Sequence, residues 1–258
     1  MPIELLGLYL RLPVFALVAA RLGGLLMFQP VLGALAIPVH LRALLVLGLA
    51  ALLTPAVRLP ADAPTNLAAL TIALAGELLL GILLSLVSVA CFLGLQLGGL
   101  LIAQESGLAF GQILDPNSEE QESVTSMLYL QLAVVVYFIV GGHRALVSAC
   151  LDTFRTIPLL DAAAATHPAA DLILEALAVS GQIALRVAAP TMLAMFLVNL
   201  ALGFVSRTMP QFNVLTFGFS VKALAGFVLM AVSLPAAVQA FLFGLEELES
   251  GLAELFGG

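Results

Sequence analysis

Residues 67–102, LAALTIALAGELLLGILLSLVSVACFLGLQLGGLLI, are apolar at almost every position and contain one charged residue, Glu77. The apolar residues form a continuous run and do not alternate with polar ones, which indicates a buried or lipid-facing helix and not a half-buried strand. A helix needs about 20 apolar residues to cross a bilayer. The run is too long for a single crossing, so we expect helices that extend well beyond the hydrocarbon core.

Similar apolar runs fill most of the rest of the chain, and two of them contain an internal proline, Pro190 and Pro235. Prolines are tolerated in membrane helices as kinks. The sequence therefore predicts an all-α membrane protein made of long, kinked hydrophobic helices. The approximate limits of the further runs are Leu5–Phe28, Leu35–Val57, Ser123–Val140, Leu172–Val205 and Phe212–Leu245.

The composition supports the same fold class. The 258 residues are 62% hydrophobic and 10% charged, whereas a soluble domain has about 25% charged residues. The mean hydropathy is +1.16. A net charge of −7 with few lysines and arginines excludes the basic surface that binds nucleic acid. No linker divides the chain, so we expect a single domain. Cys91 and Cys150 have no metal-like spacing and are expected to be buried thiols.

Four charged residues, Arg21, Glu77, Arg186 and Lys222, lie inside apolar runs. A charge at the centre of a bilayer costs roughly 2.5–3.5 kcal/mol, so these groups must be paired, reach the interface, or face water. They could form an ion or substrate pathway, or they could pair within the helix bundle or against another subunit. We favour pairing, because a proton relay usually needs several carboxylates and Glu77 is the one carboxylate in these runs.

The segment Gly94–Glu122 combines small and polar residues. Gly99, Ala103, Gly107 and Gly111 recur every fourth residue, a pattern that lets another backbone approach a helix closely. Gln96, Gln104, Glu105 and Gln112 are interleaved with them, and Asp115-Pro116 is expected to end the helix, with a break at about residues 114–117. Irregular backbone at membrane depth must be buried in protein or line a cavity, so this segment predicts a pore or constriction.

No catalytic motif accompanies this pattern. The sequence has no HExxH, no GxSxG and no Walker A lysine, and His40, His143 and His167 are widely separated. Catalytic histidines need a positioned partner. We therefore expect a protein that is not an enzyme and needs no cofactor or metal.

At these residues the chain resembles the FliR family of flagellar export-gate proteins, over nearly its whole length. The similarity depends on the order and spacing of several short motifs, and no single motif would suffice. They are Arg21 with Pro30, Ile37-Pro38 and Arg42; Gly107-Leu108-Ala109-Phe110; Asp115-Pro116 with Ser118; Gly142-His143; Asp152-Thr153-Phe154 with Pro158; Asn199-Leu200-Ala201-Leu202-Gly203 with Arg207; Met209-Pro210-Gln211; and Gly218-Phe219 with Lys222.

The resemblance implies partners and an architecture. Family members assemble with FliP and FliQ into a closed gate for unfolded export substrates, FlhB surrounds it, and the gate lies in the bacterial inner membrane at the flagellar basal body. The chain would then consist of FliP-like helices (about 1–165, with the plug region at 104–118) and a FliQ-like helical hairpin (166–258). The junction would fall near Ala162–Asp171.

The resemblance also implies functional residues. Plug residues in the lumen would be Gln104, Glu105, Ser106, Gly107, Leu108, Ala109, Phe110, Gly111, Gln112, Ile113, Leu114, Asp115 and Pro116. We expect Arg21, Glu77, Arg186, Arg207 and Lys222 to be charges at subunit interfaces.

Two alternatives remain open at the level of sequence. The first is an injectisome subunit of the same family. The second is a secondary transporter in which Arg21, Glu77, Arg186 and Lys222 form a substrate or proton site, which would predict inverted repeats in the two halves. No repeat is evident in the sequence.

Overall fold

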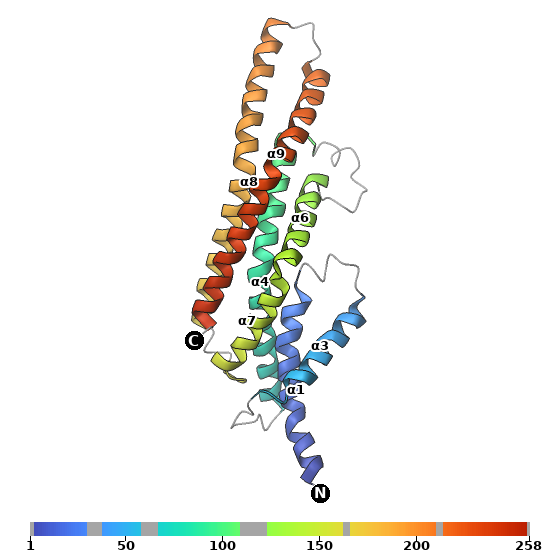
Figure 1. Cartoon of the computed structure of the whole chain (residues 1–258), viewed down its shortest axis with the longest axis vertical. Coiled ribbons are helices and arrows are strands. Elements are labelled where there is room, and N and C mark those ends of the chain that lie inside the picture. The colour runs from blue at the N-terminus through green and yellow to red at the C-terminus, as the bar shows by residue number, and fades with distance from the viewer. Residues whose placement is uncertain are drawn as a thin grey trace. The chain divides into compact units, whose positions relative to one another are not determined.

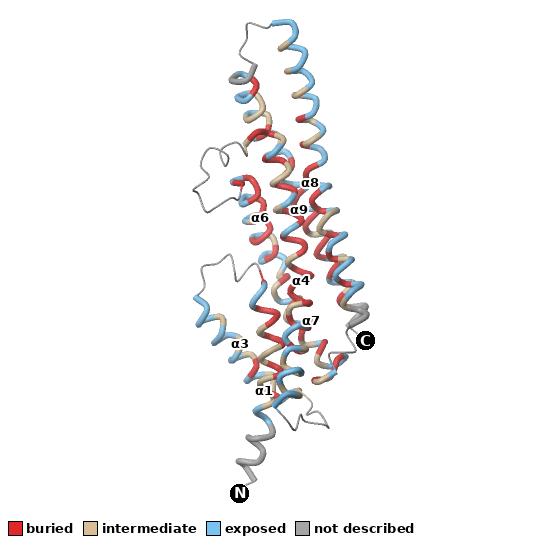
Figure 2. The backbone as a smooth tube through the Cα atoms, turned by 180° about the vertical axis from the view of Figure 1, so that it is seen from behind, coloured by how far each residue is buried: buried red, intermediate tan, exposed pale blue. Residues whose placement is uncertain are grey.

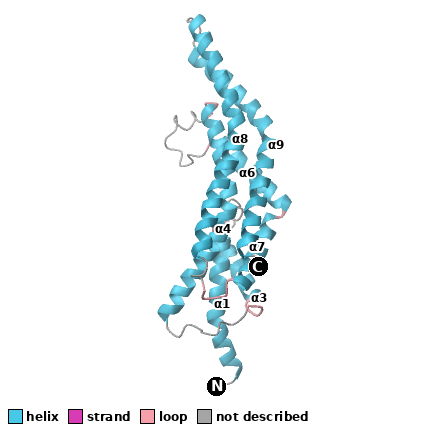
Figure 3. Cartoon of the chain, turned by 90° about the vertical axis from the view of Figure 1, so that its left-hand side faces the viewer, coloured by secondary structure: helices cyan, strands magenta, loops and turns pink. Residues whose placement is uncertain are grey.

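The computed structural model describes residues 3–29, 38–57, 67–108, 123–161, 166–209 and 214–256. All regular structure in these ranges is helical, as Figure 3 shows, and the expected all-α fold is confirmed. The helices are α1 (Ile3–Met27), α3 (Val39–Leu53), α4 (Leu67–Glu105), α6 (Val124–Val140), α7 (Gly142–Thr156), α8 (Thr166–Thr208) and α9 (Val214–Phe256) (Figure 1).

Among the described residues, three helices are long and apolar enough to cross a membrane, within α4, α8 and α9, and α6 with α7 would make a fourth span interrupted at Gly141. The helices α4, α8 and α9 have 39, 43 and 43 residues. At 1.5 Å per residue they are roughly 60 Å long, about twice the thickness of the hydrocarbon core. The predicted excess of helix length is therefore confirmed. Pro190 and Pro235 lie inside α8 and α9 as expected.

The second apolar run is shorter than a membrane span. Its helix, α3, has 15 residues and ends at Leu53, so the expectation of a helix reaching Val57 is wrong. Pro55 explains the early end, because a proline has no N–H with which to continue the helical hydrogen bonds. Thr54 closes the helix with its N–H donating to the carbonyl of Ala50 over 2.9 Å.

The last helix is longer than its apolar run. The sequence predicts an end near Leu245, but α9 continues to Phe256, through the acidic residues that follow. Leu245, Leu248 and Leu252 are at most 5% exposed. Their spacing places them on one face of a helix. An amphipathic stretch of about three turns therefore extends α9 beyond the end of its continuous apolar run.

Residue contacts group the chain into two compact units. The first consists of Met1–Ala90, Gly141–Leu177 and Glu247–Gly258, and the second of Cys91–Val140 and Ala178–Glu246. Each unit draws on residues from both sides of the predicted junction near Ala162–Asp171. The division into FliP-like and FliQ-like parts remains a prediction.

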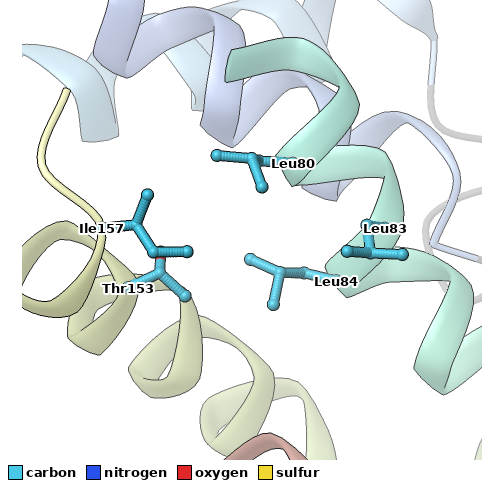
Figure 4. A pocket seen from close by; sticks show the side chains of 5 residues that line it. All are labelled: Leu80, Leu83, Leu84, Thr153 and Ile157. Carbon is cyan, nitrogen blue, oxygen red and sulfur yellow. The ribbon is translucent and has the colours of Figure 1, made fainter. Parts of the chain in front are cut away.

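In the first unit, α1 packs against α3 and α4. Leu17, Val18 and Leu25 on α1 are fully buried. A narrow apolar space between α4 and α7 is lined by Leu80, Leu83, Leu84, Thr153 and Ile157, whose side chains are drawn in Figure 4.

In the second unit, aromatic rings join three helices. The ring of Phe92 on α4 lies edge-on to Tyr137 of α6, with centroids 5.3 Å apart, and to Phe241 of α9, with centroids 5.2 Å apart. All three side chains are at most 1% exposed. Cys91 beside this cluster and Cys150 in the first unit are both buried thiols, as the sequence predicts.

Candidate functional site

Helix α4 ends at Glu105, inside the segment predicted to form the plug. The N–H of Ser106 donates to the carbonyl of Ile102 over 3.0 Å, and its hydroxyl donates to the same carbonyl over 2.7 Å. Gly107 then has a φ of 76°. A glycine in this left-handed conformation commonly ends a helix, because it lacks the Cβ that would clash. The expectation that the helix continues to Asp115 is wrong.

The described part of the predicted plug segment, Gln104–Leu108, differs strongly in exposure from residue to residue. Gln104 is exposed, Ser106 and Gly107 are buried, and Glu105 and Leu108 are partly exposed. The remaining predicted plug residues lie outside the described ranges: Ala109, Phe110, Gly111, Gln112, Ile113, Leu114, Asp115 and Pro116. The chain therefore leaves α4 from a buried point.

The small residues of α4 make close helix contacts in the second unit. A Cβ on Gly99 would lie 2.9 Å from the Cα of Ser126 and 2.7 Å from the ring of Tyr129, both on α6. Ala103, four residues later, is fully buried. These contacts confirm the first half of the predicted ridge. Gly107 does not continue the ridge, because its backbone is no longer helical.

Gly94 and Gly98 form a second row of small residues on α4, which was not predicted from the sequence. A Cβ on Gly94 would lie 2.6 Å from the carbonyl oxygen of Ser180 in α8, and a Cβ on Gly98 would lie 3.2 Å from that of Ala184. The four-residue spacing of Gly94 and Gly98 is the feature of the sequence from which this row could have been predicted.

A groove of about 350 Å³ lies in the second unit, next to these contacts. Three leucines of α4 form its apolar wall, and Gln96 and three serines supply polar groups. Its lining consists of Leu93, Gln96, Leu97, Leu100, Ser123, Ser126 and Ser180. The polar Gln96 that the sequence interleaves with the small residues therefore faces an open space and not a packed core.

Arg21 and Glu77 form a buried ion pair in the first unit. Nε of Arg21 lies 2.6 Å from Oε2 of Glu77, and both side chains are fully buried. The guanidinium also donates to the hydroxyl of Thr153 over 3.2 Å and to the carbonyl of Ile157 over 3.3 Å. The other carboxylate oxygen of Glu77 accepts the N–H of Leu160 over 3.1 Å. Both charges are thus satisfied inside the chain.

Two features hold this pair in place. The guanidinium carbon of Arg21 lies 4.3 Å from the ring centre of Phe154. One helical turn away, Gly24 of α1 and Gly81 of α4 face each other, and a Cβ on either residue would overlap the other helix's backbone. The missing Cβ atoms let the two helices approach closely enough for the short contact between Arg21 and Glu77.

The other predicted interface charges are not enclosed. Arg186 is exposed on α8, with its guanidinium carbon 4.4 Å from the ring centre of Phe243. Arg207 is exposed in the last turn of α8, and Lys222 on α9 is partly exposed. The interface role remains a prediction for these three. For Arg21 and Glu77, the structure gives pairing within the bundle, which the sequence had left open.

These features define a helical integral membrane protein in which the long apolar helix α4 ends at a buried turn of polar and small residues. Among the described residues, no group of histidine, cysteine, aspartate and glutamate side chains could hold a metal ion. The chain belongs to the family of bacterial export proteins, family 1, whose model matches residues 12–248.

Individual relatives of the chain occur in two kinds of system. It is 28% identical over 222 residues to the flagellar biosynthetic protein FliR of Caulobacter vibrioides, which covers 86% of this chain and 88% of the relative. It is 30% identical over 223 residues to that of Escherichia coli, which covers 83% and 82%. The Yop proteins translocation protein T of Yersinia pestis is 27% identical over 157 residues, 60% of each protein.

Proposed function

We propose that this chain is a core subunit of the flagellar type III protein export gate in the bacterial inner membrane. It would form, with FliP and FliQ, the closed channel for unfolded export substrates, and FlhB would surround it. The family match supports the general role in export. The flagellar assignment is supported by the FliR proteins of Caulobacter vibrioides and Escherichia coli, which match over more than four fifths of their length.

The observation that carries this proposal is the large apolar surface of α8 and α9. In the most apolar stretches of the spans, 67% of residues are buried in α4, but only 22% in α8 and 33% in α9. Figure 2 shows exposed residues recurring along both of these helices. Because the helices are about twice as long as the hydrocarbon core is thick, lipid can cover only part of this surface. Neighbouring membrane subunits would cover the rest.

The plug role is proposed for Gln104–Pro116. The buried turn of Ser106 and Gly107 lies two residues after the segment begins, so this end of the segment is fixed to the helices of the second unit. A segment anchored at one end can close a channel at rest and move aside when a substrate enters. Polar residues such as Gln104 suit a wet lumen better than a packed helix interface.

The Arg21–Glu77 pair weighs against a transporter. A transport site needs charged groups that can bind and release a substrate or a proton. Both oxygens of Glu77 are already hydrogen bonded, and the guanidinium of Arg21 has three partners within the chain. An injectisome export subunit of the same family is the second candidate, supported by the similarity to the Yersinia protein.

Two experiments test the proposal. A tagged chain is purified from its own membranes, and the proteins that accompany it are identified by mass spectrometry. FliP, FliQ and FlhB homologues should be found, and their absence would overturn the assembly. In the second experiment, residues 109–113 are deleted, and membrane conductance and the export of flagellar proteins are measured. The deletion should alter one or both.

A matched control separates the plug from general damage. Gly48 lies on α3, and a Cβ there would meet no atom within 4 Å. Gly48→Ala should leave both conductance and export at the level of the unmodified chain. If the deletion also leaves both unchanged, the plug assignment is wrong.

A further inference from the structure

Gly226 of α9 lies against the buried turn at which the chain leaves α4. A Cβ at position 226 would overlap the Cβ of Ser106 and would lie 3.1 Å from its Oγ. Gly226 is buried, and Ser106 has no exposed surface. The two residues therefore touch because one of them has no side chain. Both belong to the second unit.

Ser106 has no easy way to move out of such a contact. Its hydroxyl donates to the carbonyl of Ile102 over 2.7 Å and approaches that of Ala103 at 3.3 Å. The atom that would collide is Cβ, which moves only with the backbone. The next residue, Gly107, already has a left-handed backbone with a φ of 76°. A side chain at position 226 would therefore displace the turn itself.

We propose that Gly226 is a positioning residue for the plug: it sets where the chain leaves α4 and so where the plug segment begins. This inference rests on the proposed plug function of Gln104–Pro116. Gly226 does not belong to that segment and is 120 residues from Ser106 in the sequence. Even a methyl group at this position moves the start of the plug and loosens the closed gate.

The competing explanation is that Gly226 only lets two helices pack. Gly244 provides the matched comparison, since it lies on the same helix and its Cβ would lie 2.5 Å from Cδ1 of Ile183 on α8. Gly244→Ala disturbs packing away from the plug. Gly181→Ala, at a position with no atom within 4 Å of the new Cβ, controls for the change of glycine to alanine.

The test uses the assembled gate in cells whose own copy of the gene is deleted. Membrane conductance, export of flagellar proteins and co-purification of partner subunits are measured for each variant. Gly226→Ala should give a several-fold rise in ion leakage while partners co-purify as before. Gly244→Ala and Gly181→Ala should not leak. If Gly226→Ala leaks no more than Gly244→Ala, the proposal is overturned.

A double variant tests the contact directly. Ser106→Gly removes the colliding Cβ, and the nearest remaining atom to a Cβ at 226 is then the Cα of residue 106, at 3.6 Å, an ordinary contact. The leakage of Ser106→Gly with Gly226→Ala should not exceed that of Ser106→Gly alone. Ser106→Ala keeps the Cβ, so this background should retain the full effect of Gly226→Ala. Equal effects of Gly226→Ala in both backgrounds would refute the contact mechanism.

The deletion of residues 109–113 separates the two levels of inference. If the deletion leaks and Gly226→Ala does not, only the positioning role is wrong. If neither leaks, the plug function itself is wrong, and the positioning role is overturned with it.

Discussion

The Nε atom of Arg21 lies 2.6 Å from Oε2 of Glu77, and neither side chain has any exposed surface. The two residues are 56 positions apart in the sequence. The pair joins α1 to α4, and its further hydrogen bonds reach the end of α7 and the turn after it. Leu160 in that turn has a φ of 79°, which is unusual for a residue with a branched side chain. Its hydrogen bond to Glu77 helps to hold this conformation.

Removing one charge of this pair should destabilise the chain strongly. Glu77→Ala or Arg21→Ala leaves a buried, uncompensated charge, and such changes typically cost about 3–5 kcal/mol. Thermal unfolding of the purified protein in detergent measures the loss. Replacing both residues, Arg21→Met with Glu77→Leu, should recover much of the stability.

The exposed pair of Arg155 and Asp152 is the control for this prediction. Their charged atoms are 3.6 Å apart, and the side chains are 85% and 53% exposed. Because water screens such pairs, Asp152→Ala should not measurably change the melting temperature. An equal loss for Asp152→Ala and Glu77→Ala would contradict the role given to burial.

The close crossing of α1 and α4 predicts a strong effect of small substitutions. Gly81→Ala places a Cβ against the carbonyl of Arg21, and Gly24→Ala places one against the carbonyl of Leu78. Overfilling a packed contact costs about 1–3 kcal/mol. Gly48 on α3 has no atom within 4 Å of a new Cβ, so Gly48→Ala should be neutral or stabilising by up to about 1 kcal/mol. Unfolding curves in detergent should show a loss of stability for Gly81→Ala and Gly24→Ala and none for Gly48→Ala, and an equal loss for all three would contradict the close crossing.

The hydroxyls of Tyr129 on α6 and Ser233 on α9 lie 2.5 Å apart, and Ser233 also donates to the carbonyl of Met230 over 2.9 Å. Tyr129 is therefore the donor between the two. Tyr129→Phe should cost about 0.5–1.5 kcal/mol. A double-mutant cycle with Ser233→Ala should show that the second change costs less when the phenol is already absent. Strictly additive losses would mean that the two hydroxyls do not interact.

The residue between α6 and α7 should tolerate few side chains. Gly141 has a φ of 82°, and a residue with a Cβ pays roughly 1–2 kcal/mol for this conformation. Gly141→Ala should therefore lower stability by about that amount, and Gly141→Asn by less, because asparagine adopts the left-handed region more readily. Stabilities measured in the same detergent, with Gly203→Ala as the helical control, test the ranking. An equal loss for the alanine and asparagine variants would rule out backbone strain as the cause.

The helices could be predicted because their signal is local. Continuous apolar runs identify α4, α8 and α9, and the predicted run that ends at Val140 matches the end of α6. The end of α3 before Pro55 was not predicted. The end of α4 was missed for a physical reason. Gly107 fits both a small-residue ridge and a helix terminus, and the choice depends on the hydroxyl of Ser106 and on the contact with Gly226. That contact joins residues far apart in the sequence.

For the buried charges, too, one part could be predicted from the sequence and another part depends on the fold. Their cost in an apolar run predicts that Arg21 and Glu77 must find partners. Which partner each finds depends on a helix crossing made possible by Gly24 and Gly81, and neither glycine stands out among the 22 in the chain. The family motif residues Thr153 and Phe154 prove to be contacts of Arg21. Sequence similarity marked them without indicating what they touch.

The length of α8 and α9 has a consequence for how the protein is made. Each helix has 43 residues, more than two windows of the roughly 20 residues that an insertion machinery accepts as a membrane segment. A newly synthesised chain therefore has more than one insertion register available along each helix, and neighbouring subunits can favour a register other than the one that the lone chain adopts. Depth in the bilayer becomes a property of the assembled complex, reached when neighbours cover one part of each helix and leave the other to lipid. Cysteine accessibility along α8 should then differ between the lone chain and the complex.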